Sequence, residues 1–238
     1  MKLSDSLKYV NRKAVSSNNQ NELIIWIDVH SSLSSIIDFC RYSIDFSICE
    51  YLSSMDLYST ELKIPDSACV SSRSFTFGFA AFLSLEKIEI GNKNFPSAAM
   101  FILNRLNKLK TLEIGGNSFT NHQDSYGDIE TRSFHILNCD KLKSIAIGRF
   151  SFSDYAGEFE LKNLPSLKSI LIGEYYKSSY CFYVASFKIQ GMGDVITSTI
   201  DLPSLKTIEL GYDVFAMSIT TVIHSICEHL FLFKISPN

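Results

Sequence analysis

The chain has 238 residues, of which 46% are hydrophobic and 13% aromatic, so it can bury a substantial core and wholesale disorder is excluded. Its formal net charge is −3, and Lys and Arg are scattered along the chain rather than clustered. Such a chain lacks the basic surface that neutralises phosphates, so we expect no binding to nucleic acid.

Residues 1–22 are predicted to form a polar N-terminal tail. The tail contains no apolar run of about 7 to 15 residues, which a secretory signal needs. We therefore expect a cytoplasmic protein, or a cell-surface protein if an N-terminal signal is missing from this chain. Residues 23–60 are expected to be either a degenerate first repeat or an N-terminal cap.

Residues 61–215 contain a repeated phrase, L-x-x-I-x-I-G, in which Leu can replace Ile. Five copies occur, at residues 85–91, 109–115, 142–148, 167–173 and 205–211. Their glycines are 24, 33, 25 and 38 residues apart, so two of the repeats carry insertions. A weaker sixth copy, Leu62-Lys-Ile64-Pro65, precedes them.

Two further features recur with the phrase. Four copies are followed, four residues after the glycine, by an aromatic residue, namely Phe95, Phe119, Phe152 and Phe215. A second phrase, F-x-[FIL]-x-x-[FLC]-x-x-L, runs into the first four copies from upstream. Agreement at so many positions exceeds what composition alone would produce and identifies an internal repeat.

The alternation I-x-I in each copy predicts a short β-strand with one buried face, because successive side chains of a strand point to opposite faces. A strand of this length cannot close a core alone, so the copies must stack as a parallel sheet. We expect an α/β or mostly β fold, a solenoid with a parallel β-sheet on its concave face and short irregular or helical links on its convex face. Link segments such as residues 100–109 are either one helical turn or a second short strand.

The phrase resembles the leucine-rich repeat, L-x-x-L-x-L-x-x-N-x-L. The copy that runs from Leu109 through Asn117 to Phe119 fits every position, with Phe in the last apolar slot. The other copies depart at the asparagine position, where Lys93, Phe150, Tyr175 and Asp213 stand, so we expect no regular asparagine ladder. The cadence of Cys139 to Ile147 is similar to the BspA-like branch of the family. This resemblance implies a protein-binding module or scaffold, or else a surface adhesion or structural protein.

The sequence offers no arrangement typical of catalysis, so we expect a protein that is not an enzyme and has no cofactor. Gly191 and Gly193 lack the strand and helix context of a nucleotide-binding loop. The acid pairs Glu158/Glu160 and Asp124/Asp128 are expected in solvated loops.

We also expect no metal site. His224, Cys227 and His229 form one cluster where a structural tetrahedral site draws its ligands from two. The six cysteines contain no C-x-x-C pair, and we read them as reduced thiols, with a disulfide set as the alternative.

Two surfaces are candidates for binding a protein or peptide. The first is the set of concave residues that alternate with the buried Ile and Leu: Lys87, Glu89, Thr111, Glu113, Ser144, Ala146, Ser169, Leu171, Thr207 and Glu209. The second is the insertion after the fourth copy, with Tyr175, Tyr176, Tyr180 and Tyr183, because tyrosines are frequent in protein interfaces. The alternative for the insertion is an extra strand that packs on the core.

Residues 216–238 are predicted to form a C-terminal cap, since the last repeat would otherwise expose an apolar edge. Their apolar residues from Ile219 to Leu232 have near-helical spacing. His224, Glu228 and His229 interrupt the apolar stretch, so we expect no insertion into a membrane. The partner and the oligomeric state do not follow from the sequence.

Overall fold

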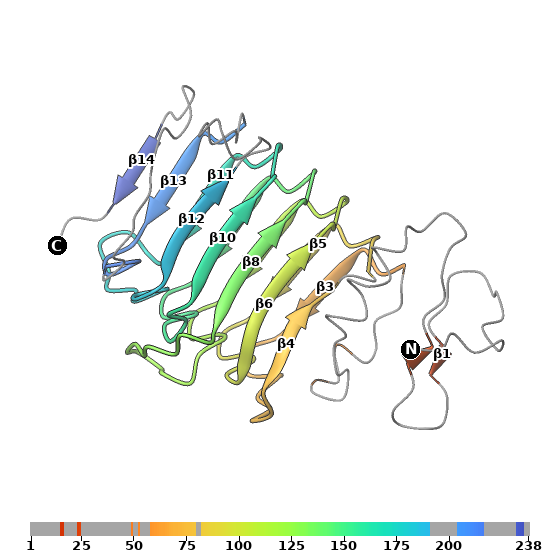
Figure 1. Ribbon diagram of the computed structural model, residues 1–238, viewed down its shortest axis with the longest axis horizontal. Coiled ribbons are helices and arrows are strands. Elements are labelled where there is room, and N and C mark those ends of the chain that lie inside the picture. The colour runs from red at the N-terminus through yellow and green to blue at the C-terminus, as the bar shows by residue number, and fades with distance from the viewer. Residues whose placement is uncertain are drawn as a thin grey trace.

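The computed structural model describes residues 15–16, 23–24, 49, 52, 58–79, 82–190, 204–216 and 232–235. In these residues the protein is mostly β, with parallel sheets and almost no helix, which agrees with the expected α/β or mostly β class. Figure 1 shows two large sheets, one in front of the other. A small separate pair, β1 (Val15–Ser16) and β2 (Leu23–Ile24), is antiparallel.

The repeated phrase forms a seven-stranded parallel sheet in the order β14-β13-β11-β9-β7-β5-β3. In β3 to β13 every second residue is buried, as the I-x-I alternation predicts. The weak sixth copy forms β3, and each later strand pairs with the copy before it. The strands are β3 (Glu61–Ile64), β5 (Lys87–Ile90), β7 (Thr111–Ile114), β9 (Ser144–Ile147), β11 (Ser169–Ile172), β13 (Thr207–Leu210) and β14 (Leu232–Ile235).

The upstream phrase also forms strands, and these make a five-stranded parallel sheet in the order β12-β10-β8-β6-β4. The link segments are thus second short strands, one of the two alternatives that we expected, and not helical turns. The chain visits the two sheets in alternation from β3 to β13. The strands are β4 (Phe75–Gly78), β6 (Ala98–Asn104), β8 (Ser133–Leu137), β10 (Glu158–Lys162) and β12 (Ser186–Gln190).

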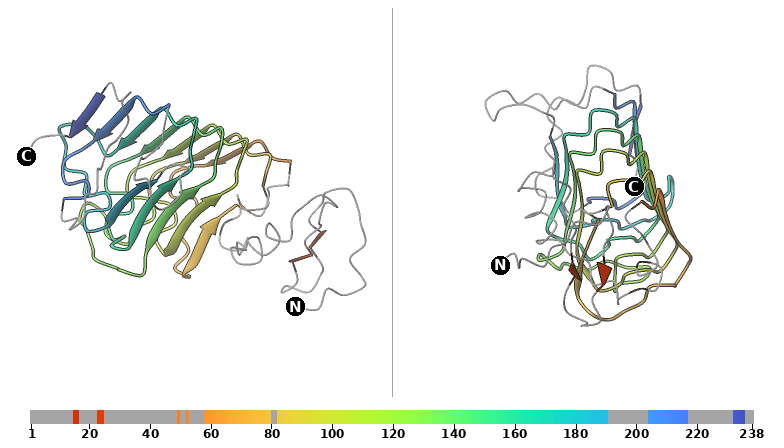
Figure 2. Two further views of the ribbon diagram at one scale, coloured as in Figure 1. Left: turned by 45° about the horizontal axis from the view of Figure 1, so that its top comes forward. Right: turned by 90° about the vertical axis from the view of Figure 1, so that its right-hand side faces the viewer.

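The two sheets form the two walls of the stack, which Figure 2 shows end-on in its right-hand view, and phenylalanines fill the space between them. In one row, Phe77, Phe101, Phe134 and Phe159 of the five-stranded sheet stack with ring centroids 4.7–5.1 Å apart. In the other row, Phe95, Phe119, Phe152, Phe182 and Phe215 lie 4.7–5.5 Å apart. The rows meet edge to face, a favourable geometry for aromatic rings.

The glycine at the end of the phrase is required mainly because neighbouring repeats approach closely. A Cβ on Gly148 would lie 2.6 Å from the backbone nitrogen of Gly116, and one on Gly115 would lie 2.6 Å from that of Asn92. Among the described glycines, Gly173 alone has a positive φ, of +77°, so close approach rather than a left-handed backbone is the more general reason for glycine at this position.

A buried row of polar side chains runs along the turns that follow the glycines. Asn94 Oδ1 accepts a hydrogen bond from the backbone N–H of Cys69 at 2.9 Å. The backbone N–H of Asn94 donates to Ser118 Oγ at 3.1 Å. The Ser118 amide donates to Ser151 Oγ at 3.0 Å. This row lies one residue beyond the asparagine position of the phrase. Asn117, which does occupy that position, instead donates to Asp124 Oδ1 and accepts from the Asp124 amide.

Two expectations need correction. Cys49 and Cys69 form a disulfide across a sequence separation of 20, whereas we expected reduced thiols; Cys139 and Cys181 are buried free thiols as expected. Leu232, which we counted in a helical pattern, lies in a strand, because 232–235 pair with β13. The rest of the C-terminal cap, residues 217–231 and 236–238, lies outside the described residues, as do nearly all of residues 1–57.

Candidate functional site

The ten predicted concave residues lie in two straight rows on the outward face of the seven-stranded sheet. Strand register places Lys87, Thr111, Ser144, Ser169 and Thr207 in one row. The second row, two residues further along each strand, is Glu89, Glu113, Ala146, Leu171 and Glu209. All ten side chains are half-buried or exposed, while their strand neighbours are buried. We call this surface the outer face.

Charges on the outer face gather at its N-terminal end, where they pair with one another. Lys63 Nζ lies 2.8 Å from Glu89 Oε1, and Lys87 Nζ lies 2.9 Å from Glu89 Oε2. These two lysines lower the pKa of the Glu89 carboxyl through hydrogen bonds, and the same bond to Glu89 raises the pKa of Lys87. Lys87 Nζ also lies 3.9 Å from Glu113. This end of the face therefore carries both signs in a mutually compensated network.

The centre of the outer face carries no charge. Ser144, Ala146 and Ser169 are small, and they lie on one side of Leu171, a large hydrophobic residue that is 40% exposed. Glu209 follows at the far side, next to Leu171 in register. The face thus has a neutral centre with one exposed leucine and a charged border on both sides.

The four predicted tyrosines fall into two groups. Tyr180 and Tyr183 contact each other at 5.3 Å between ring centroids, and both contact Tyr126, at 5.5 and 4.1 Å. Tyr175 and Tyr176 form a separate pair at 4.1 Å, with Tyr176 65% exposed. None of the four lies in a strand. The insertion does supply an extra strand, β12, from Ser186 onward, while a docking role for the tyrosines stays a prediction.

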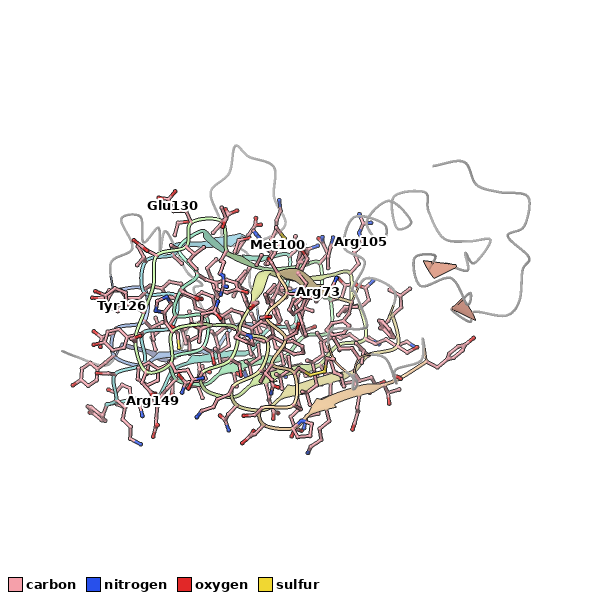
Figure 3. All side chains as sticks on the ribbon, turned by 90° about the horizontal axis from the view of Figure 1, so that it is seen from below. Arg73, Met100, Arg105, Tyr126, Glu130 and Arg149 are labelled. Carbon is pink, nitrogen blue, oxygen red and sulfur yellow. A yellow bond between two sulfur atoms is a disulfide. The ribbon has the colours of Figure 1, made fainter. Side chains whose placement is uncertain are left out.

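Tyr126 was not predicted, and it comes from the other long insertion, between the second and third copies. Figure 3 shows Tyr126 and Arg149 at the same edge of the molecule, on the left of that view. Arg149 lies over the Phe150 ring at 4.9 Å, and its Nε donates to the Ser178 carbonyl at 2.8 Å. The two insertions therefore meet at one edge, which sequence spacing alone does not reveal.

A buried ion pair anchors the insertion that carries Tyr126. The Arg132 guanidinium donates to Asp154 Oδ2 at 2.9 Å, and the Asn121 amide donates to the same oxygen at 3.0 Å. Arg132 also donates to the Pro96 carbonyl at 3.1 Å. Asp154 is fully buried, so removing either charged partner would leave the other uncompensated. These contacts give the insertion a fixed base.

We expected the pair Glu158/Glu160 in a loop, and this was wrong. Both residues lie in β10, on the outward face of the five-stranded sheet. Strand register places Glu160 next to His135 of β8, and His135 Nδ1 lies 3.2 Å from Glu160 Oε2. Both side chains are mostly buried, at 15% and 13% exposure. Aligning the upstream phrase would have found this pair, because His135 and Glu160 each follow its first phenylalanine. Asp124 and Asp128 do lie in an exposed loop.

The two buried free thiols have no arrangement for nucleophilic chemistry. Burial raises the pKa of both Cys139 and Cys181 to about 12, so neither forms a thiolate near neutral pH. They are core residues of the turns between sheets.

No family model, curated protein or solved structure matches the chain. Among the residues that the structure describes, no helix has the length and apolar character for a membrane crossing.

Proposed function

We propose that this chain is a leucine-rich-repeat protein of the solenoid type, and that it works as a non-enzymatic protein-binding module or scaffold. The repeated phrase and the alternation of the chain between two parallel sheets support the first part. The second part follows from the stack itself, since one strand of each repeat adds to one continuous surface.

The observation that carries the binding proposal is the composition of the outer face. Specific protein interfaces have a core depleted of charged residues and a polar border that stays accessible to solvent. The outer face has the same arrangement, with Leu171 among Ser144, Ala146 and Ser169. The partner is a protein or peptide whose own contact surface is largely uncharged at its centre.

The test is affinity capture with the tagged full chain, read by mass spectrometry. The variant A146D/L171D places two charges in the neutral centre and should lose the captured partner, because a desolvated unpaired charge opposes docking. The matched control M100D/S133D places the same charges on the outward side of the five-stranded sheet, where the two positions are also register neighbours. Equal capture by both variants, with unfolding midpoints like that of the unmodified chain, would sink the proposal.

The Cys49–Cys69 disulfide favours a second candidate, an adhesion or structural protein of the cell surface. Disulfides persist in oxidising environments and are rare in the cytosol. We expect the intact mass to show one bridge when the protein is isolated from its native compartment under alkylating conditions. Recovery of both cysteines as alkylated thiols would instead support the cytoplasmic location, which stays a prediction.

A further inference from the structure

We propose that His135, Glu158 and Glu160 form a binding site for a zinc-type divalent cation on the outward face of the five-stranded sheet. Each of the three offers one ligand atom, and these atoms all lie within 4.8 Å of one another. The site is distinct from the outer face, which belongs to the other sheet, and so the proposal stands independently of the binding function above.

Strand geometry brings the three ligands together. Glu158 and Glu160 are two residues apart on β10 and therefore point to the same side of the sheet. His135 stands next to Glu160 in the register of β8, and adjacent strands lie about 4.8 Å apart. Both strands lie between other strands of the sheet, so the backbone beneath the ligands is rigid.

The donor set selects the cation. An imidazole nitrogen suits Zn²⁺ and similar transition metals, whereas Mg²⁺ and Ca²⁺ prefer oxygen ligands alone. Zn²⁺ binds His nitrogen and carboxylate oxygen at about 2.0 to 2.2 Å. Ligand atoms within 4.8 Å of one another reach these distances through small side-chain rotations, and water completes a tetrahedral site.

The surroundings of the site favour binding. His135 and Glu160 are only 15% and 13% exposed, so water competes weakly for the cation. His135 Nδ1 already lies 3.2 Å from Glu160 Oε2, so two of the three ligands are held together before the cation binds.

The experiment is calorimetric titration of the metal-free full chain with zinc chloride, together with thermal unfolding with and without zinc. We expect one site per chain whose affinity falls by at least about tenfold in H135Q and in E158Q. The matched control H122Q changes an exposed loop histidine and should leave that affinity unchanged. Circular dichroism shows whether H135Q or E158Q has lost its fold. If one of them has, the zinc affinity of the other tests the proposal.

Three results would overturn the proposal. The first is zinc affinity that H135Q and E158Q leave intact and that H224Q/C227S/H229Q abolishes, which would assign the metal to the C-terminal cluster. The second is equal stabilisation by Mg²⁺ and Zn²⁺ at the same concentration, which would indicate a site without the imidazole ligand. The third is the absence of any zinc binding.

Discussion

Left-handed backbone conformations recur at fixed places in the repeat. The phenylalanines of the second row all have positive φ, between 51° and 58°. The residues two positions before them also have positive φ, between 46° and 62°. Side chains with a Cβ are disfavoured in this conformation by about 1 to 2 kcal/mol. The phenylalanines tolerate it because the conformation turns each ring into the core, whereas Lys93, two positions before Phe95, is exposed and gains no such burial.

Lys93 therefore offers a stabilising substitution. It is exposed and has a φ of 57°, so we expect K93G to raise the free energy of unfolding by about 0.5 to 1 kcal/mol, after the entropic cost of glycine is subtracted. The control K141G changes an exposed turn lysine that is not among the residues with positive φ, and it should be neutral or destabilising. Urea unfolding measures both. A loss of stability in K93G would contradict the conformational argument.

The buried thiols give a second prediction at this scale. With the pKa of Cys139 and Cys181 raised to about 12, iodoacetamide should leave both unmodified in the folded chain at pH 8 and label both in denaturant. A raised thiol pKa adds stability below the unfolded value near 9, and this contribution is lost as pH rises toward 12. Mass spectrometry of the two peptides reads the labelling. Fast modification of the folded protein would show that these thiols are accessible.

At the scale of elements, the insertions prove to be part of the packing as well as the surface. Phe182 lies nine residues after Gly173, not four, yet it fills the place of the fourth repeat in the second row of phenylalanines. The preceding turn residues, from Glu174 to Ser179, extend the path before the chain returns to the core. The insertion therefore keeps a phenylalanine in the core row, and its additional residues lie in the turn outside the core.

We accordingly expect F182A to lower the free energy of unfolding by about 3 to 5 kcal/mol, as for other buried phenylalanines. The control Y176A removes an aromatic ring of the same insertion that is 65% exposed and should change stability little. Denaturant unfolding of both variants is the measurement. Comparable small losses would mean that the insertion does not supply a core residue.

The strands of the seven-stranded sheet could be predicted from the sequence because buried and outward residues alternate strictly within each copy. For the segments that form the second sheet, the sequence did not decide between a strand and a helical turn. The pattern F-x-[FIL] is too short to distinguish the two-residue period of a strand from the roughly 3.6-residue period of a helix. Phe182 was missed because a fixed offset from the glycine does not survive an insertion. The buried polar row, at Asn94, Ser118 and Ser151, was missed because it lies one position beyond the asparagine position at which we compared the copies of the phrase.

At the scale of the whole molecule, the candidate surfaces differ in how far sequence could define them. The residues of the outer face follow from the alternation of buried and outward side chains along each strand. Strand register then places these ten residues in two rows. The meeting of Tyr126 with Tyr180 and Tyr183 depends on how two insertions fold back, which no local pattern encodes. The grouping of His135 with Glu158 and Glu160 depends on register between copies, which is visible once the upstream phrase is aligned.

The two parallel sheets also separate the two proposed activities in space. The outer face and the His135 site lie on different sheets, so a change in one should leave the other intact. The core between the sheets is continuous from Leu62 to Phe215, so both surfaces rest on one body of packed side chains.

The most direct test of the account is hydroxyl-radical footprinting of the captured complex against the free chain. Oxidation of Leu171 should fall strongly in the complex, while Met100, on the five-stranded sheet, should oxidise as in the free chain. The opposite pattern, with Leu171 unchanged and Tyr126 or Tyr176 protected, would contradict it and would move the binding surface to the tyrosines of the two insertions.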